Sequence, residues 1–466
     1  MEALREGKTL HKVDIFPAFT RPDTNGHDII SPIPKIECSN TCETGINHLL
    51  FFLFVNNMNE FQTSDLLLPL PVMASEENTF AHYTIVSRLP GVIERVIKDN
   101  DFPPTIVQQL ESLVADLFEG WVRPLAEIEG QDIVAWESYL QPFEGKSWFD
   151  LPFYFAEAYF FRRLLEATDY FVPGIWQGID PFAYQKYSSL EKSMDAIRVI
   201  SNRFTALPEQ QSYQTSITTM LQTALWGNQV DLSLWPLRGG DNTHRELHQQ
   251  QTHILIDDTY DILNYLNNIH GERIDLIIDN ASFELVCDFF LIDFLLSTQT
   301  ANTVYLHLKA HPTFVSDAMS QDIFYTLEKL ANDISENVRI LATRLQEYIA
   351  SGRLICRDDF FWNAPLAFWE MPQSLREELA KASLVLIKGD ANYRRIIGDR
   401  HWLFTTPLSD IANYFPTPFV ALRTLKSEVA TGLEPDQIEI LSEQDPLWLT
   451  NGQWGVIQFV IPESYS

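Results

Sequence analysis

Four apolar runs in the second half of the chain each end in polar residues of kinds that bind metals or phosphates. The runs span 274–280, 303–312, 383–392 and 419–426, and helical patterns lie between the first three. Alternation of strands and helices predicts an α/β fold, with a parallel sheet covered by helices on both faces. Ligands bind at the carboxyl ends of the strands in such a sheet, so we expect these polar residues to meet in one site.

The composition and the spacing of apolar residues divide the rest of the chain into further parts. Residues 1–75 carry scattered prolines and no sustained periodicity, and we interpret them as an irregular N-terminal extension. Residues 76–236 repeat apolar side chains at three- and four-residue spacing, which predicts an all-helical N-terminal layer. A polar stretch rich in glutamine marks a boundary at 237–252, and residues 253–466 are expected to form the α/β core that binds metal and phosphate.

The composition excludes several classes of partner. With 63 acidic and 33 basic side chains, the formal charge of −30 would repel a polyanion, so no nucleic acid is expected as a ligand. No apolar run reaches the ~20 residues that cross a bilayer, so no membrane association is expected. The opening residues lack a secretory pattern and the chain has four cysteines, which favours a cytoplasmic protein.

The first two runs provide oxygen donors. Asp279 and Asn280 follow the first strand, and Asp317 lies shortly past the second. Carboxylate and amide oxygens suit a divalent cation such as Mg²⁺ or Mn²⁺, with Co²⁺ or Ni²⁺ as further candidates. A second interpretation stays open, because Asp, Asn and Ser favour helix caps and 279–282 could simply begin a helix. A second carboxylate near the same edge favours the shared metal site.

The third and fourth runs end in cations that are flanked by further oxygen donors. Lysine and arginine facing a divalent metal form a clamp for phosphate, because arginine grips two oxygens at once and lysine acts as a point charge. The residues concerned are Lys388, Asp390 and Asn392 after the third run, and Arg423 and Lys426 after the fourth.

Five motifs occur along the chain in a fixed order: LWGNQVDLSLW (225–235), IIDNASFELVCDFFLIDFLLS (277–297), FVSDAM (314–319), IKGDANYRRIIGDRHW (387–402) and RTLKSEVATGLEP (423–435). Together they resemble the damage-control phosphatase family, subfamily III, whose eukaryotic members are called acidic-residue methyltransferase-like. The resemblance extends from about residue 79 to 459, which is most of the chain.

The resemblance implies a helical N-terminal layer on a Rossmann-like core. It also implies a metal-dependent phosphatase acting on small phosphorylated metabolites, usually sugar phosphates of the fructose 1-phosphate kind. Transferred motif by motif, it assigns Asp279, Asn280 and Asp317 to the metal, and Lys388, Asp390, Asn392, Arg423 and Lys426 to the substrate phosphate, with Glu284 and Asn228 nearby. The family usually reads Asp-Asn-Ser-Gly-Phe-Glu, whereas this chain has Ala281-Ser282, so we expect its backbone to approach the ligand less closely.

The expected reaction is hydrolysis of a phosphate monoester, with Asp279 at the metal and either Asp390 or Glu284 as the general base. Two other functions stay open. One is S-adenosylmethionine-dependent methylation of protein carboxyl (glutamate) groups, although no glycine-rich loop follows the first strand and the basic residues suit a phosphate better. The other is a non-enzymatic metabolite sensor whose residues 1–75 contact a protein partner.

Overall fold

The computed structural model describes residues 68–205, 212–227, 253–269 and 271–463. All of them belong to one compact unit that spans 61–466. No helix in these ranges is both long and apolar enough to cross a membrane. Asn228 and most of the expected extension 1–75 lie outside the described residues.

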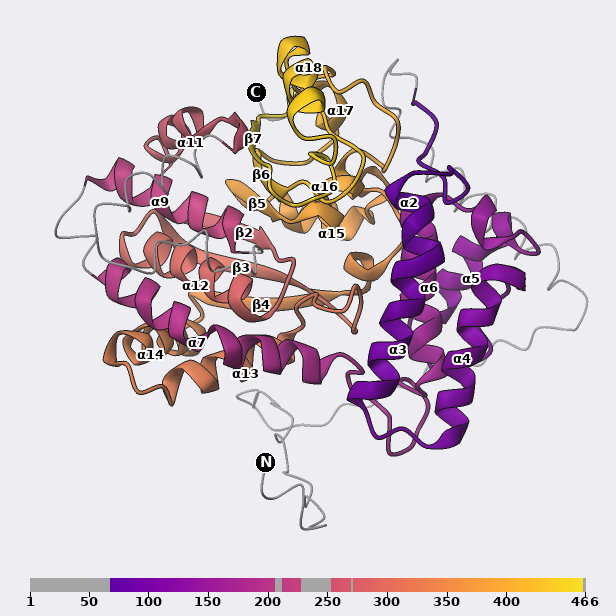
Figure 1. Cartoon of the computed structure of the whole chain (residues 1–466). Coiled ribbons are helices and arrows are strands. Elements are labelled where there is room, and N and C mark those ends of the chain that lie inside the picture. The colour runs from indigo at the N-terminus through magenta and orange to yellow at the C-terminus, as the bar shows by residue number, and fades with distance from the viewer. Residues whose placement is uncertain (1–67, 206–211, 228–252, 270, 464–466) are drawn as a thin grey trace, which may run out of the picture. The chain divides into compact units, whose positions relative to one another are not determined.

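Seven strands form one sheet in the described part of the chain, in the order β1-β7-β6-β5-β2-β3-β4 (Figure 1). The four runs that predict strands correspond to β2, β3, β5 and β6, and the α/β fold class is confirmed. The strands are β1 (Ile254–Asp257), β2 (Glu272–Ile277), β3 (Ala301–Lys309), β4 (Leu354–Asp359), β5 (Leu384–Lys388), β6 (Phe419–Thr424) and β7 (Gly455–Val460).

The expectation of a wholly parallel sheet is wrong at β7, which pairs antiparallel with β6. An antiparallel neighbour needs no crossover to the other end of the sheet, so the chain between β6 and β7 can stay at the edge where β6 ends. The two ends of this segment meet past β6, where the backbone N–H of Leu425 donates to the carbonyl of Trp454 at 2.8 Å. A parallel sheet that carries an antiparallel segment is common among α/β folds.

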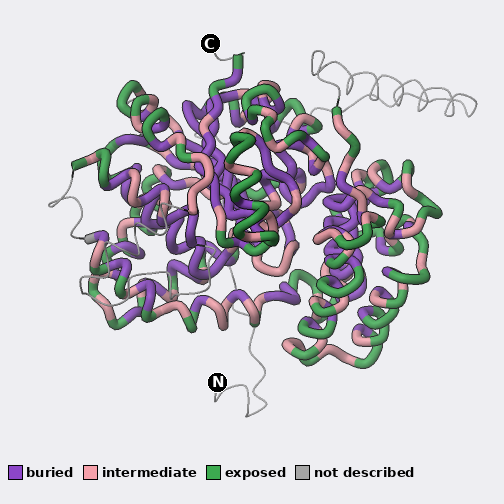
Figure 2. Tube along the Cα trace, turned by 45° about the horizontal axis from the view of Figure 1, so that its top comes forward, coloured by how far each residue is buried: buried purple, intermediate pink, exposed green. Residues whose placement is uncertain are grey.

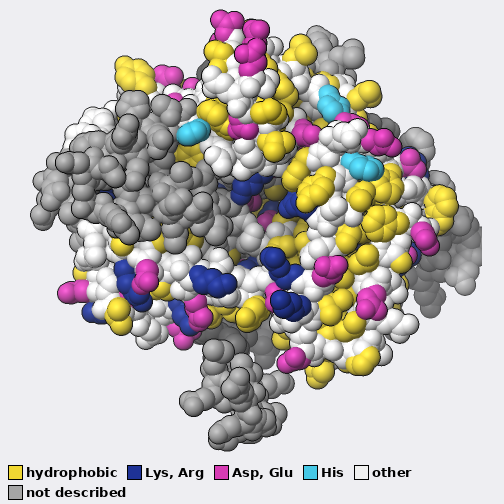
Figure 3. Space-filling view, in the orientation of Figure 1, with side chains coloured by type: hydrophobic (Ala, Val, Ile, Leu, Met, Phe, Trp, Pro, Cys, Tyr) yellow, Lys and Arg dark blue, Asp and Glu magenta, His cyan; other side chains and the backbone are white. Residues whose placement is uncertain are grey.

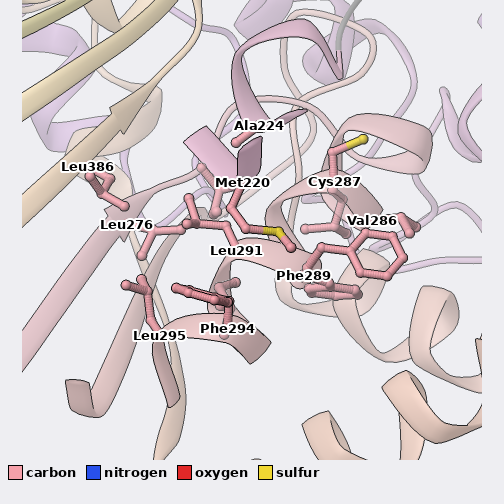
Figure 4. Close-up of a cluster of buried hydrophobic side chains, with 14 of the residues drawn as sticks. Met220, Ala224, Leu276, Val286, Cys287, Phe289, Leu291, Phe294, Leu295 and Leu386 are labelled. Atoms are coloured by element: carbon pink, nitrogen blue, oxygen red, sulfur yellow. The ribbon is translucent and has the colours of Figure 1, made fainter. Parts of the chain in front are cut away.

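The first face of the sheet packs against a large apolar core that contains Leu276 and Leu386 (Figure 4). Met220 and Ala224 lie in the same core, so the helix at 213–226 belongs to the sheet rather than to a separate helical part. The helices of this core are α7 (Ala183–Thr205), α9 (Tyr213–Trp226), α11 (Thr259–Leu266), α12 (Ser282–Ser297), α13 (Ser320–Ala331) and α14 (Glu336–Ala350).

Helix α12 is central to this core, because all of its residues from 282 to 296 are buried. Figure 2 shows that buried residues concentrate in the interior, while exposed residues lie mainly on the outer helices and loops. The sequence of α12 is apolar all round, as expected of a helix enclosed on every side. Three acidic residues nevertheless lie in it: Glu284, Asp288 and Asp293. Glu284 and Asp288 are four residues apart and therefore share one side of the helix.

The second face of the sheet packs against another apolar core. The alternate strand residues, among them Ile277 and Ile387, point into this core and are buried there. Four helices contribute to it: α15 (Gln373–Leu379), α16 (Asp390–Ile396), α17 (Leu408–Ala412) and α18 (Pro435–Gln444). The sheet thus has helices on both faces, as the alternation of strands and helices predicts.

A third core lies among the N-terminal helices α3 (Leu89–Asp99), α4 (Pro104–Glu119), α5 (Ile133–Leu140) and α6 (Phe153–Ala167), whereas Ala81 of the short helix α2 (Phe80–Tyr83) packs in the second core. This group is attached to the sheet by Arg394 of α16, whose guanidinium lies 2.6 Å from Glu157 of α6 and 2.8 Å from Asp399. The predicted helical stretch 76–236 is therefore shared between this layer and the sheet's first core. The boundaries 76 and 236 of a separate helical domain remain a prediction.

Candidate active site

The carboxyl ends of β2 and β3 are joined by a short antiparallel contact. Ala281 donates its backbone N–H to the carbonyl of Ser316 at 2.7 Å, and Ala318 donates to the carbonyl of Asp279 at 2.8 Å. These bonds place Asn280 directly opposite Asp317. Residues 37 positions apart in the sequence thus meet at one edge of the sheet.

The helix-cap interpretation of 279–282 is wrong. Helix α12 begins at Ser282, and no side chain forms a capping hydrogen bond at its N-terminus. The side chain of Asn280 instead donates to Asp279 Oδ2 at 2.6 Å and to Glu284 Oε2 at 2.8 Å, while its own Oδ1 accepts from Ser316. Asn280 therefore connects two carboxylates within the site.

Asp279 lies among other acids in a buried environment. Its pKa is raised well above the ordinary value by burial and by the negative charges of Glu284 and Asp317, and only partly offset by Lys309 and Lys426. Asp279, Glu284 and Asp317 thus bring three buried carboxyl groups together, and the negative charges of the other two disfavour ionisation of Asp279. Such a group is suited to a cation.

Asp317 has a lysine partner that the sequence reasoning missed. Lys309 is the last residue of β3, and its ammonium nitrogen lies 3.3 Å from Asp317 Oδ2 and donates to the carbonyl of Trp362 at 2.7 Å. Burial raises the pKa of Asp317 to about 6 in spite of this partner, and burial lowers the pKa of Lys309. The available signal was a lysine that ends an apolar run, as Lys388 does.

Lys388, the last residue of β5, pairs with two buried acids of α12. Its ammonium is 2.9 Å from Glu284 Oε1 and 2.7 Å from Asp288 Oδ1, which lie on one side of α12. These two carboxylates raise the pKa of Lys388 although burial opposes its charge. Because Lys388 already has two anionic partners, its assignment to the substrate phosphate stays a prediction.

Gly389 follows Lys388 with a backbone φ of +85°. A Cβ at this position would lie 2.0 Å from Asp279 Oδ2, closer than any real contact. Glycine is therefore required both for the backbone conformation and for the space beside the carboxylate. This contact links the end of β5 to the end of β2.

Asp390, the first residue of α16, is held by three donors. Its Oδ1 accepts from Arg423 Nε at 2.8 Å, from Ser427 Oγ at 3.0 Å and from the backbone N–H of Lys426 at 3.1 Å. Burial alone would raise the pKa of Asp390, but the charges of Arg423 and Arg394 and the hydrogen bond from the backbone N–H of Lys426 lower it below the ordinary value. A carboxylate with these partners is a weak base. Its hydrogen bond with the backbone N–H of Lys426 fixes the start of the segment after β6.

Arg423 is nearly fully buried, and its remaining contacts are internal as well. Its Nη2 donates to Ser427 Oγ at 3.0 Å, and its guanidinium stacks 4.3 Å from the ring centre of Tyr393. Asn392 is also internal, since its Nδ2 donates to the carbonyls of Lys388 at 2.9 Å and of Ile278 at 3.4 Å. Both residues hold strand ends in place.

Lys426 differs from the other cations at this edge. It forms no ion pair with any residue that the structure describes, yet its charge lowers the pKa of Asp279. Figure 3 shows Lys and Arg side chains around a depression on the face drawn. Lys426 is therefore the predicted phosphate ligand with the greatest freedom to bind an anion.

The donor set fits a hard divalent cation. Within the described ranges, no group of three or more histidine, cysteine or acidic side chains has the arrangement of a complete metal centre. The predicted ligands Asp279, Asn280 and Asp317 supply two carboxylates and one amide oxygen, and the amide carbonyl keeps a second lone pair beside its bond to Ser316. Oxygen-only donors of this kind are typical of Mg²⁺ or Mn²⁺ sites, in which water completes the coordination.

A family model described as the damage-control phosphatase ARMT1-like domain matches residues 84–441. The chain belongs to this family. Damage-control phosphatase ARMT1 of Mus musculus is 31% identical over 437 residues, which cover 84% of this chain and 98% of the relative. The Homo sapiens protein of the same name is 30% identical over 447 residues, covering 84% and 99%. A DUF89 family protein from Pyrococcus horikoshii of known crystal structure aligns with a TM-score of 0.42 and 14% identity, over 75% of this chain and 96% of that one.

The match to the ARMT1-like domain contains every predicted site residue, which confirms the resemblance drawn from the five motifs. The position at which the family pattern has glycine is Ser282 in this chain. Ser282 adopts a φ of +63°, which glycine reaches without strain, and its Oγ donates to the carbonyl of Lys186 at 2.7 Å. Serine thus keeps the left-handed backbone conformation at the start of α12.

Proposed function

We propose that this protein is a metal-dependent phosphatase that hydrolyses phosphate monoesters of small metabolites, with sugar phosphates of the fructose 1-phosphate kind as substrates. Membership of the damage-control phosphatase family supports a hydrolase acting on small phosphorylated compounds. The observation that carries the proposal is the group of buried acids, Asp279, Glu284 and Asp317, together with Lys426, whose charge acts on Asp279 and which forms no ion pair with any described residue.

In this proposal Asp279, Asn280 and Asp317 hold one Mn²⁺, Co²⁺, Ni²⁺ or Mg²⁺ ion. When bound, such an ion polarises a phosphoryl oxygen and lowers the pKa of a coordinated water. The acids that face it are buried, so their interactions with charge are weakened less by solvent than they would be at the surface.

The chain's own residues bind and position the substrate. Lys426 binds a phosphoryl oxygen, and its backbone is fixed by Asp390, which is in turn held by Arg423. Positioning of this kind supplies much of the rate in phosphoryl transfer. Asp390 acts as a positioning residue, and Glu284 is the proposed general base, because its Oε2 lies 2.8 Å from the side chain of the predicted metal ligand Asn280.

The test is release of phosphate from a panel of sugar phosphates by protein loaded with each of the four metals. We expect metal-dependent turnover by the natural protein and loss of at least about a hundredfold in Asp279→Asn. The matched control is Asp293→Asn. It replaces another buried acid, in the C-terminal half of α12, whose ion-pair partner is Arg344. Full activity of Asp279→Asn, or equal loss in the control, would contradict the assignment.

The other two functions are tested in the same preparation. Methyl transfer from S-adenosylmethionine has no specific observation in its favour among the described residues, and labelled methyl incorporation into protein would reveal it. A sensor would bind sugar phosphates without turnover. The proposal places the enzyme in the cytoplasm, and a protein partner for residues 1–75 remains part of it as a prediction.

A further inference from the structure

Lys309 is a buried cation that the proposed reaction does not use. Its ammonium lies 3.3 Å from Asp317 Oδ2, and its side chain is 2% exposed. Among the described residues it is the cation in contact with Asp317. Lys388, the corresponding lysine at the end of β5, pairs with Glu284 and Asp288 instead.

The position of Lys309 is fixed from several directions. Its ammonium donates to the carbonyl of Trp362 at 2.7 Å, and its backbone N–H donates to the carbonyl of Ala318 at 3.0 Å. The residue therefore holds the segment of Asp317 with its backbone and the Asp317 carboxylate with its side chain. A charge anchored in this way stays beside the carboxylate when another ion approaches.

The charges around Asp317 have a consequence for metal binding. Without a divalent ion, Lys309 compensates a buried carboxylate that would otherwise be strongly destabilising. With a divalent ion on the same carboxylate, the lysine becomes a like charge at short range and opposes binding. One residue thus stabilises the metal-free protein and weakens its affinity for metal.

We propose that Lys309 is a built-in counter-ion of the site, which neutralises Asp317 in the metal-free protein and thereby sets how tightly the divalent cation binds. The inference rests on the proposed function, because it takes Asp317 as a metal ligand. Lys309 acts through Asp317 and is therefore a positioning residue. Its role differs from that of a phosphate ligand, since its removal changes metal binding in the absence of any substrate.

The experiment is titration of the metal-free full chain with Mn²⁺ by calorimetry, together with thermal unfolding in the presence and absence of Mn²⁺. In Lys309→Gln, which keeps a donor for Trp362 but removes the charge, we expect Mn²⁺ to bind about ten- to a hundredfold more tightly. The metal-free variant should unfold at a lower temperature than the natural protein, and Mn²⁺ should restore most of that loss. Lys309→Arg, which keeps the charge, should bind Mn²⁺ within a few-fold of the natural protein.

The matched control is Arg162→Gln. Arg162 is equally buried and pairs with Glu127 and Asp132, two acids outside the predicted ligand set. Its replacement should lower the unfolding temperature without recovery in Mn²⁺. Recovery of Lys309→Gln alone would support a role specific to the metal site.

Several outcomes would overturn the inference. Unchanged or weaker Mn²⁺ binding in Lys309→Gln would do so, as would a variant that stays unfolded even with Mn²⁺, because either result makes Lys309 a structural residue. Folding of Lys309→Gln only when Mn²⁺ is present would support it. Failure of the natural protein to bind any Mn²⁺ would instead refute the metal assignment of the proposed function.

Discussion

Replacement of Gly389 by alanine tests whether the ends of β5 and β2 form one site. Gly389 has φ +85° and ψ 168°, a region that is almost restricted to glycine. The added Cβ would lie 2.0 Å from Asp279 Oδ2 and 2.1 Å from its Cγ. The substitution therefore strains the backbone and pushes directly on a predicted metal ligand.

The two effects have different sizes. Backbone strain in this region costs about 1 to 3 kcal/mol of unfolding free energy. The carboxylate of Asp279 must also move by about 1 Å to reach an ordinary contact distance, and a displacement of that size at a reacting centre costs about a hundredfold in rate. We expect Gly389→Ala to lose about a hundredfold in phosphatase activity and to bind Mn²⁺ more weakly.

The matched control is Gly352→Ala. Gly352 has φ +72°, but a Cβ there meets no atom within 4 Å. It precedes β4, which is parallel to β3, so it lies at the opposite edge of the sheet from the site. This variant should lose about 1 to 2 kcal/mol of stability and keep its activity.

Phosphate release, Mn²⁺ calorimetry and denaturant unfolding of both variants separate strain from displacement. Full activity and unchanged Mn²⁺ affinity in Gly389→Ala would refute the reasoning, because Asp279 would then not be required where the structure has it. Equal loss of activity in both variants would show that backbone strain alone is responsible.

Three further predictions concern single side chains. Ser282→Gly should change the unfolding free energy by less than about 1 kcal/mol, because relief of the left-handed backbone offsets the lost hydrogen bond; a larger loss in denaturant unfolding would contradict this. Asp390→Asn should lower kcat/KM about ten- to a hundredfold, chiefly through KM, because it loosens Lys426; a kcat loss above about a thousandfold would identify Asp390 as the base. Burial raises the pKa of Asp293 to about 6 although Arg344 opposes it, so stability present at low pH is lost as the pH rises from about 4 through 6. Asp293→Asn should remove that loss, up to about 3 kcal/mol, and parallel pH profiles of unfolding for the two proteins would refute it.

The polar ends of the four apolar runs were predictable because strand periodicity and apolar content are local properties of the sequence. The runs at 274–280 and 383–392 gave β2 and β5 and placed Asp279 and Lys388 at their ends. Three strands escaped prediction: β1, β4 and β7. β1 has four residues, and β4 ends in Arg357-Asp358-Asp359, so neither has a long apolar run. The direction of β7 depends on where the chain returns, which is not a local property.

The roles within the site required the tertiary structure. Arg423 and Lys426 are three residues apart and equally basic in sequence, yet Arg423 is buried against Asp390 and Lys426 has no anionic partner in the described residues. The partnership of Lys309 with Asp317 depends on the return of the chain after β3, which pairs Lys309 with Met319, and the contact of Asn280 with Asp317 then joins this segment to the end of β2. Such assignments depend on distances between segments far apart in the chain.

By itself, the amino-acid sequence determined the α/β class, the family and the residues at which the strands end, because these follow from local patterns and motifs. Only the tertiary structure decided which charges compensate one another. Electrostatic interactions in a buried site depend on separations of a few ångströms and on exclusion of water, and both arise when distant segments pack together.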